Sequence, residues 1–277
     1  GTLTRPSDDG DGRRAAHDAS ANFVFFPPWN AGAELVSSGA DGAIRLWSVA
    51  RRDMIAEITD AHEGGVNAIV VLADQLRMAS GGADGYVRVW DTNDLRSSSQ
   101  TAQAIGEFGP IGESAWGLAC SPTEDLIAVG GKVDGHKILL WDLNSDSPPR
   151  ELLGHTNNVT HLTFSEDGRT LASTSQDMSA RLWNIELGQE LPSPQSPLRG
   201  HSGDVQSIQF TPDGQSILTA SMDHSIRIWD RQTGESKCSL LGHTKGVQFT
   251  LVSSDGTLVL STGWDNTTRI WRAPRIE

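Results

Sequence analysis

The chain has 277 residues, of which 37% are hydrophobic, and it carries a formal net charge of −13 at pH 7. This acidic balance disfavours nucleic acid and anionic membranes as general partners, because both are bound through clustered lysine and arginine. No apolar run approaches the ~20 residues of a membrane-spanning helix, and two cysteines are too few for a disulfide framework or a metal site.

Six similar pentapeptides follow one another along the chain, and each ends in a tryptophan: AIRLW (Trp47), YVRVW (Trp90), KILLW (Trp141), SARLW (Trp183), SIRIW (Trp229) and TTRIW (Trp271). The first and last tryptophans lie 224 residues apart, so the mean spacing is about 45 residues. Repeats of roughly 40 to 45 residues are typical of four-stranded propeller blades. The spacing therefore predicts an all-β propeller of six four-stranded antiparallel blades.

Polar residues recur at fixed offsets before these tryptophans. A histidine and an aspartate lie 22 residues apart in four copies, and the aspartate precedes the tryptophan by six: His62/Asp84, His155/Asp177, His201/Asp223 and His243/Asp265. A serine or threonine lies four residues before the aspartate, at Ser37, Ser80, Ser173, Thr219 and Ser261. Such fixed offsets indicate one repeated structural unit.

The first and third copies depart from this pattern. Copy one has two extra residues after Phe26 but keeps the four residue types, at His17, Ser37, Asp41 and Trp47. Copy three has Ile111 where histidine is expected, and its Asp134 lies seven residues before Trp141. We therefore expect blade three to lack the polar set.

The strands can be predicted within one copy. The runs VTHLTF, TLASTS and SARLW, between residues 159 and 183, are rich in β-branched and apolar residues and are separated by the turn formers Asp167-Gly168 and Asp177. The fourth, outer strand has a weaker pattern. Two stretches interrupt the repeat, at residues 92–112 and at the proline-rich residues 190–197, and both are predicted to be long loops at outer strands.

The chain resembles the WD-repeat family. The resemblance rests on Gly-His dipeptides at residues 154–155, 200–201 and 242–243 and on Trp-Asp dipeptides at residues 90–91, 141–142 and 229–230, and it covers residues 17–271. In that family the indole, hydroxyl, imidazole and carboxylate form a structural hydrogen-bonded network in each blade. The resemblance implies this role for His62, Ser80, Asp84, Trp90, His155, Ser173, Asp177, Trp183, His201, Thr219, Asp223, Trp229, His243, Ser261, Asp265 and Trp271.

The end of the repeats leaves the closure of the ring open to more than one solution. Only six residues follow Trp271, too few for an outer strand of the last blade. The resemblance implies that an N-terminal latch, residues 1–16, completes that blade and closes a propeller of residues 17–277. The alternatives are a seven-bladed ring, which needs about 45 further residues upstream, and an open ring that a partner chain completes laterally.

The resemblance also implies a docking surface at the top face, to which each blade contributes three positions. The first set follows the first-strand valine or alanine: Asn22, Asn67, Trp116, Thr160, Gln206 and Gln248. The second set lies two residues before the first: Ser20, Gly65, Ser114, Asn158, Asp204 and Gly246. The third set precedes the turn aspartate: Ala40, Ala83, Val133, Gln176, Met222 and Trp264. Large apolar residues on a polar face are the usual anchors of protein interfaces. We therefore expect partners at Trp116, Met222, Trp264, Asn67, Gln206, Gln248, Asn158, Gln176 and Asp204.

The repetition of serine, histidine and aspartate argues against catalysis. A nucleophilic site needs one such set in a cleft, whereas a set present in nearly every blade is architectural. The top-face positions offer Asp204 as their one charged group. We expect a non-enzymatic scaffold in the cytoplasm, or alternatively the nucleus, with no cofactor. It would bind a protein or peptide, as one module of a larger protein or as a subunit of a multiprotein assembly.

Overall fold

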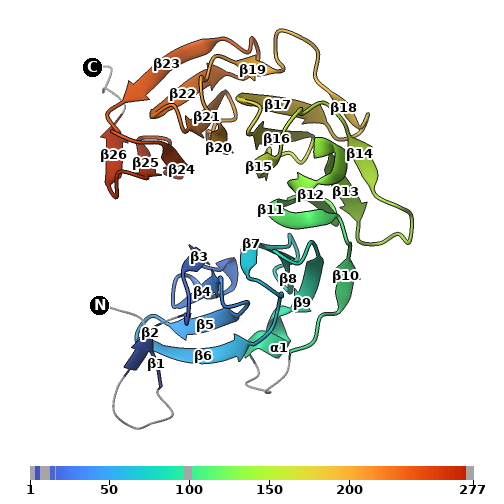
Figure 1. Ribbon diagram of the computed structural model, residues 1–277, viewed down its shortest axis with the longest axis vertical. Helices are drawn as coiled ribbons and strands as arrows, with labels where there is room; N and C mark the ends of the chain where they lie inside the picture. Colours follow the sequence, from blue (N-terminus) through green and yellow to red (C-terminus); the bar gives the residue numbers. More distant parts are fainter. Residues whose placement is uncertain (1–3, 7–12, 16, 97–101, 273–277) are drawn as a thin grey trace. The chain divides into compact units, whose positions relative to one another are not determined.

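A computed structural model describes residues 4–6, 13–15, 17–96 and 102–272. The fold is a β-propeller of six antiparallel blades, as the tryptophan spacing predicts (Figure 1). The chain divides into two compact units, residues 1–120 with 132–134 and residues 121–131 with 135–277. None of the helices within the described ranges is long and apolar enough to cross a membrane.

The first unit contains blades one and two. Blade one consists of β3 (Ala21–Phe25), β4 (Glu34–Gly39), β5 (Ile44–Ser48) and β6 (Asp53–Ile58). Blade two consists of β7 (Val66–Val71), β8 (Arg77–Gly82), β9 (Val87–Asp91) and β10 (Gly106–Phe108), with helix α1 (Thr92–Arg96) between the last two strands. The short helix η1 (Pro28–Asn30) occupies the insertion after Phe26.

Blade three spans the boundary between the units. Its strands are β11 (Gly112–Cys120), β12 (Leu126–Val133), β13 (Ile138–Asp142) and β14 (Arg150–Leu152), and the short helix η2 (Asp134–His136) joins the middle two. Val129 takes the place that Ser173 has in blade four, because each lies two residues after the strand residue that pairs with the blade tryptophan.

The second unit contains the remaining blades. Blade four has β15 (Val159–Phe164), β16 (Thr170–Ser175) and β17 (Ser179–Asn184), and its outer edge is shared by β18 (Gln189–Glu190) and β19 (Leu198–Arg199). The three strands predicted in this copy are therefore confirmed, and the proline-rich loop splits the fourth. Blade five has β20 (Val205–Phe210), β21 (Ser216–Ser221), β22 (Ser225–Asp230) and β23 (Ser236–Leu241).

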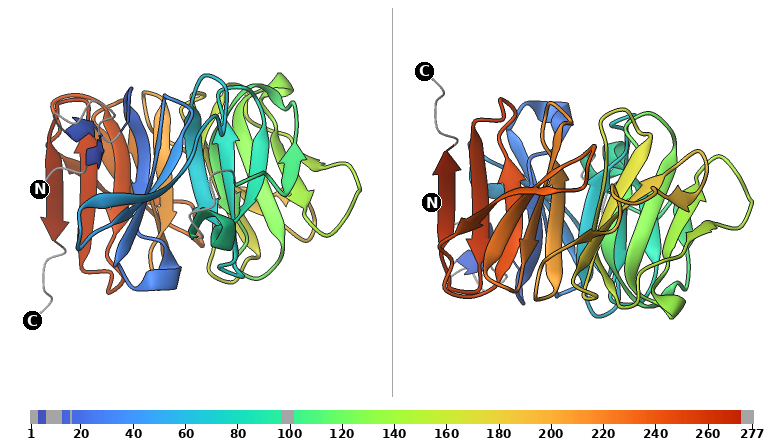
Figure 2. Two further views of the ribbon diagram at one scale, coloured as in Figure 1. Left: turned by 90° about the horizontal axis from the view of Figure 1, so that it is seen from below. Right: turned by 90° about the horizontal axis from the view of Figure 1, so that it is seen from above.

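Blade six consists of three strands in the described part of the chain: β24 (Val247–Val252), β25 (Leu258–Gly263) and β26 (Thr268–Arg272). They form the red segment at the C-terminal end of the chain (Figure 2). The N-terminal strands β1 (Thr4–Pro6) and β2 (Arg13–Ala15) pair with each other, and β1 lies near β6 of the same unit. The latch role of residues 1–16 stays a prediction, since ten of these residues lie outside the described ranges.

The core lies between successive blades. Ala172 and Leu182 of blade four pack against Ile208, Ile217 and Trp229 of blade five. Leu218 and Ile226 of blade five pack in the same way against blade six. A four-stranded blade has two apolar faces and cannot bury them by itself, so each blade depends on its neighbours.

One face of blade six is more exposed than the equivalent faces of blades four and five in the same unit. Leu260 is the third residue of β25, as Leu218 is of β21, yet Leu260 is 38% exposed whereas Leu218 is 1% exposed. The cross-strand neighbours of Leu260, which are Leu251 and Ile270, are exposed as well. These three side chains form an apolar row across the blade.

The two leucines provide a matched test of this difference. We expect Leu218→Ala to lower the free energy of unfolding by about 3 kcal/mol, because it empties a packed site. Leu260→Ala should lower it by less than about 1 kcal/mol, since part of its surface already meets water. Urea unfolding of both variants, followed by tryptophan fluorescence, measures the two values. Equal losses would show that another surface covers the face of blade six.

Candidate functional site

The repeated polar residues form a hydrogen-bonded chain inside each regular blade. In blade four the Trp183 indole donates to the Ser173 hydroxyl over 2.8 Å. The same hydroxyl lies 2.7 Å from Nε2 of His155, whose Nδ1 lies 2.8 Å from the Asp177 carboxylate. A carboxylate oxygen accepts, so Nδ1 carries the imidazole proton and Nε2 accepts from the serine. Each N–H and O–H group of this hydrogen-bonded network therefore has an acceptor.

The same chain recurs in five blades with nearly constant geometry. The distances from indole nitrogen to hydroxyl, from hydroxyl to Nε2 and from Nδ1 to carboxylate all lie between 2.7 and 2.9 Å. The structure therefore brings together His62, Ser80, Asp84 and Trp90; His155, Ser173, Asp177 and Trp183; His201, Thr219, Asp223 and Trp229; and His243, Ser261, Asp265 and Trp271. Copy one forms it with His17, Ser37, Asp41 and Trp47.

The burial of these side chains indicates that the network has a structural role. The Ser173 side chain is fully buried, and its hydroxyl already donates to one neighbour and accepts from another. Burial lowers the pKa of His155, which favours the neutral imidazole that the chain requires. Burial alone would raise the pKa of Asp177, but the hydrogen bonds that its carboxylate accepts from His155 and from the Ser179 hydroxyl outweigh it and hold that pKa well below its ordinary value. A hydroxyl so enclosed is not placed to attack a substrate.

Blade three replaces the polar chain by apolar side chains. Ile111 stands at the histidine position, Val129 at the serine position and Leu139 at the position that Arg181 has in blade four, and all three are buried. Because the hydroxyl and the imidazole are replaced together, neither is left buried without the other, and Trp141 is the one residue of the set that blade three keeps in register. Among the described residues, no group of three or more histidine, cysteine or acidic side chains is placed to hold a metal ion.

The glycine of the Gly-His dipeptides has a packing role that sequence reasoning missed. A Cβ atom on Gly154 would lie 2.7 Å from Nη1 of Arg181 and 3.1 Å from the Trp183 ring. Gly200 and Gly242 face the arginine and tryptophan of their own blades in the same way. The arginine that lies two residues before the tryptophan in five of the six copies was the available signal, because its long side chain needs space beside the histidine.

Two of the three predicted docking positions lie side by side at one end of each blade. The backbone N–H of the residue before the turn aspartate donates to the carbonyl of the residue directly before the first-strand valine or alanine, over 2.8–3.0 Å. The pairs are Ala40–Ser20, Ala83–Gly65, Gln176–Asn158, Met222–Asp204 and Trp264–Gly246. This hydrogen bond recurs in five blades and holds the top-face residues in equivalent places.

Several predicted docking side chains are bonded within the protein. The amide of Asn67 donates to the Ser114 hydroxyl and to the Ala115 carbonyl of the next blade. The amide of Asn158 donates to Gln176 within blade four. These contacts tie strands and blades together, which leaves these three amides less available to a partner.

Trp116 is half-buried, and the amine of Lys132 lies 5.6 Å from the centre of its ring. The two residues belong to the same unit and form a cation–π contact, which already covers part of the indole. Trp116 is therefore a weaker anchor than its position suggests.

The other five predicted residues belong to blades five and six of the second unit. We call Asp204, Gln206, Met222, Gln248 and Trp264 the Trp264 surface. Met222 is 37% exposed and Trp264 is 55% exposed. They meet at Gly246, where a Cβ atom would lie 2.5 Å from the Met222 sulfur and whose carbonyl accepts from the Trp264 N–H. Glycine at this position therefore lets Met222 lie across the backbone that carries Trp264.

Removal of one hydroxyl tests the polar chain. We expect Ser173→Ala to lower the free energy of unfolding by about 2–3 kcal/mol, because it leaves both the indole N–H and Nε2 of a buried network unpaired. Thermal and urea unfolding measure the loss. Ser254→Ala in an exposed turn is the matched control and should change stability by less than about 0.5 kcal/mol. A loss at Ser173 no larger than the control would contradict the structural role.

A half-buried histidine that is not part of the polar network predicts a pH dependence. His161 of β15 accepts from the Ile208 N–H over 3.4 Å and packs edge-on against Phe249. Burial lowers its pKa from 6.5 to about 4. The unfolded chain therefore binds the proton first as the pH falls, so this group's contribution to stability is complete above pH 6.5 and is lost toward pH 4.

We expect the thermal midpoint to fall from pH 7 to pH 4.5, and to fall less steeply in His161→Gln. The exposed His224 gives the control, since His224→Gln should leave the slope unchanged. Calorimetry at matched ionic strength measures the slopes. Identical slopes in the wild type and His161→Gln would rule out His161 as a source of the pH dependence.

Comparison with known proteins places these features in a family. The family model described as "WD domain, G-beta repeat" matches residues 55–91, 146–184, 192–230 and 234–272, which together exceed half of the chain. These matches end with blades two, four, five and six. The three inner strands of blade three, which lacks the polar network, and of blade one, with its insertion, lie outside the matched residues.

Several curated proteins are similar over part of their length. "Cell division cycle 20.5, cofactor of APC complex" of Arabidopsis thaliana is 28% identical over 54% of this chain and 43% of that protein. "APC/C activator protein CDH1" of Saccharomyces cerevisiae is 28% identical over 57% and 27%. "Periodic tryptophan protein 2" of Arabidopsis thaliana is 26% identical over 62% and 18%. The matched stretches thus span less than half of each relative. By its repeats, its fold and this family match, the chain belongs to the WD-repeat family.

Proposed function

We propose that this protein is a non-catalytic scaffold that binds a protein or peptide partner at the Trp264 surface. The observation that carries the proposal is the exposure of Trp264 and of Met222, two large apolar residues that both contact Gly246, Trp264 through its backbone and Met222 through its sulfur. Tryptophan is highly buried on average, so an exposed one at the end of a rigid blade needs a reason. Burial of such a ring by a partner supplies a large part of the binding energy in many interfaces.

The polar members of the surface add specificity. Gln206 and Gln248 follow the first-strand valines of neighbouring blades, and no described residue forms a hydrogen bond with either side-chain amide. An amide can both donate to and accept from the backbone of a peptide. Asp204 lies in the loop before β20 and adds one negative charge. A partner with an apolar anchor, flanked by backbone or basic groups, fits this arrangement.

The relatives support a role in an assembly. Two of them are named for a complex in which they act as cofactor or activator. A rigid propeller that holds other chains together suits such a role, and we propose that this chain is likewise a module of a larger protein or a subunit of a multiprotein complex. The cytoplasm, with the nucleus as alternative, remains our proposed location.

Truncation of the indole tests the proposal. We expect Trp264→Ala to weaken capture of a partner from extracts of the source organism at least about ten-fold, because central aromatic anchors contribute 2 kcal/mol or more. Leu187→Ala, which removes an exposed apolar side chain from a loop of blade four, is the matched control. Equal thermal midpoints would show that both variants fold. A partner retained to within two-fold by Trp264→Ala would contradict this site.

The apolar row on blade six favours a second candidate, in which a partner chain covers that blade laterally. Leu251, Leu260 and Ile270 occupy a face whose equivalent in blades four and five is packed against another blade. The partner would place apolar side chains on this row and pair a strand with the outer edge of β26. In the same capture experiment, Ile270→Lys would then abolish binding while Trp264→Ala leaves it unchanged.

A further inference from the structure

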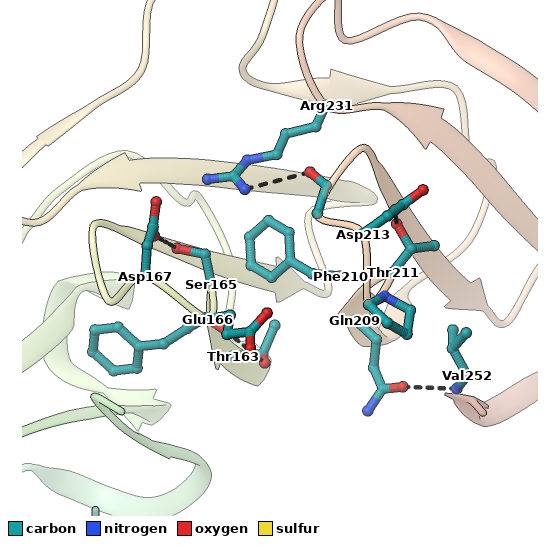
Figure 3. A pocket seen from close by; sticks show the side chains of 13 residues that line it. Thr163, Ser165, Glu166, Asp167, Gln209, Phe210, Thr211, Asp213, Arg231 and Val252 are labelled. Carbon is teal, nitrogen blue, oxygen red and sulfur yellow. Dashed lines mark hydrogen bonds between the residues drawn. The ribbon is translucent and has the colours of Figure 1, made fainter. Parts of the chain in front are cut away.

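A pocket of about 570 Å³ lies in the second unit between the turns of blades four and five (Figure 3). Its lining includes Phe164 and Phe210, which end the inner strands β15 and β20, and Val252, which ends β24. Gln206 and Gln248 stand near the beginnings of β20 and β24. The pocket therefore lies at the opposite ends of these strands from the Trp264 surface and is a separate site.

Two of the acidic side chains at the pocket hold the turns on which they stand. Asp167 accepts from the Ser165 hydroxyl over 2.6 Å and from the Arg169 N–H over 3.0 Å. Asp213 accepts in the same way from the Thr211 hydroxyl over 2.5 Å and from the Gln215 N–H over 3.0 Å. Both carboxylates therefore have local structural partners.

Arg231 is also held in place. Its guanidinium lies 4.9 Å from the centre of the Phe210 ring and donates to the Thr170 hydroxyl and the Gly214 carbonyl. Figure 3 shows the side chain crossing above the ring between Asp167 and the turn of blade five. The Arg231 guanidinium therefore already packs on an aromatic ring, donates two hydrogen bonds and lies near a carboxylate.

Glu166 differs from these three groups. No described residue pairs with its carboxylate, which belongs to an exposed residue of the pocket lining and lies beside Thr163 and Ser165 (Figure 3). The turn does not require an acid at this place, because the equivalent residues of four other blades are Ala73, Pro122, Pro212 and Ser254. A free carboxylate beside aromatic rings is therefore specific to this junction.

The position of Arg231 is specific to the junction as well. The residue two after the blade tryptophan is Val49, Thr92, Leu143 and Ile185 in the first four blades, and Thr92 and Ile185 are buried. In blade five an arginine replaces these apolar or small residues, and its side chain lies over the Phe210 ring. Both departures from the repeat, at Glu166 and at Arg231, thus meet in one pocket.

We propose that this pocket binds a basic side chain, arginine or lysine, of a partner peptide. The lining carries three carboxylates and one guanidinium, so its formal charge favours a cation. Glu166 pairs with the charged head, and the aromatic walls cover the aliphatic stem. A partner of this kind also suits a chain whose net charge is −13. The amide of Gln209, whose oxygen accepts from the Val252 N–H, keeps its NH₂ group for a peptide carbonyl.

Short labelled peptides test the proposal directly. The probes are fluorescein-labelled Gly-Ser-Arg-Ser-Gly and the same peptide with citrulline, which keeps the shape of arginine but lacks its charge. Fluorescence anisotropy measures binding to the intact wild-type chain and to Glu166→Gln. We expect the arginine peptide to bind about five-fold more tightly than the citrulline peptide, and Glu166→Gln to remove this preference.

Glu186→Gln is the matched control, because it removes the same charge from an exposed site elsewhere in blade four. It should change binding less than two-fold. Equal binding of the two peptides, or equal losses in Glu166→Gln and Glu186→Gln, would overturn the proposal, since either result indicates no site or only diffuse attraction. Trp264→Ala should leave peptide binding unchanged, so failure of this site and failure of the Trp264 surface are distinguishable.

Discussion

The structure depends on the inability of a blade to cover itself. Each blade has two apolar faces, and only another blade buries them, as Leu182 of blade four and Trp229 of blade five show. Contacts between blades therefore supply the core, and the polar chain inside each blade acts within walls that its neighbours provide. For the same reason the exposed row at Leu260 is unusual, because the equivalent residues of blades four and five, Ala172 and Leu218, are buried.

The polar chain and its absence in blade three obey one rule. A buried hydroxyl such as that of Ser173 is stable because the indole and the imidazole both bond to it. Blade three satisfies the rule in another way, with Ile111, Val129 and Leu139 in place of the polar residues. In both arrangements the buried hydroxyl and imidazole are either bonded to each other or absent together. The network is thus one of two solutions to the same packing problem.

The two proposed sites occupy positions that the architecture leaves free. At one end of the strands, the backbone bond between Trp264 and Gly246 holds the turn, so the indole itself is available. At the other end, Asp167 and its neighbour Ser165 hold the turn, so Glu166 is available. In both places the backbone and small polar groups provide the structure, and the variable side chain faces outward. A repeat fold can therefore change its partners without changing its core.

The repeats in the sequence alone determined the family resemblance, the six blades, the strands of blade four and the residues of each polar chain, because fixed offsets from a tryptophan report a unit that must pack identically each time. They also predicted the irregularity of blade three. Tertiary structure decided which docking residues are available: Asn67 bonds to the next blade and Lys132 covers part of Trp116, and both contacts join residues from different strands. It also decided where Glu166 and Arg231 meet, since residues 65 positions apart become neighbours only when two blades pack together.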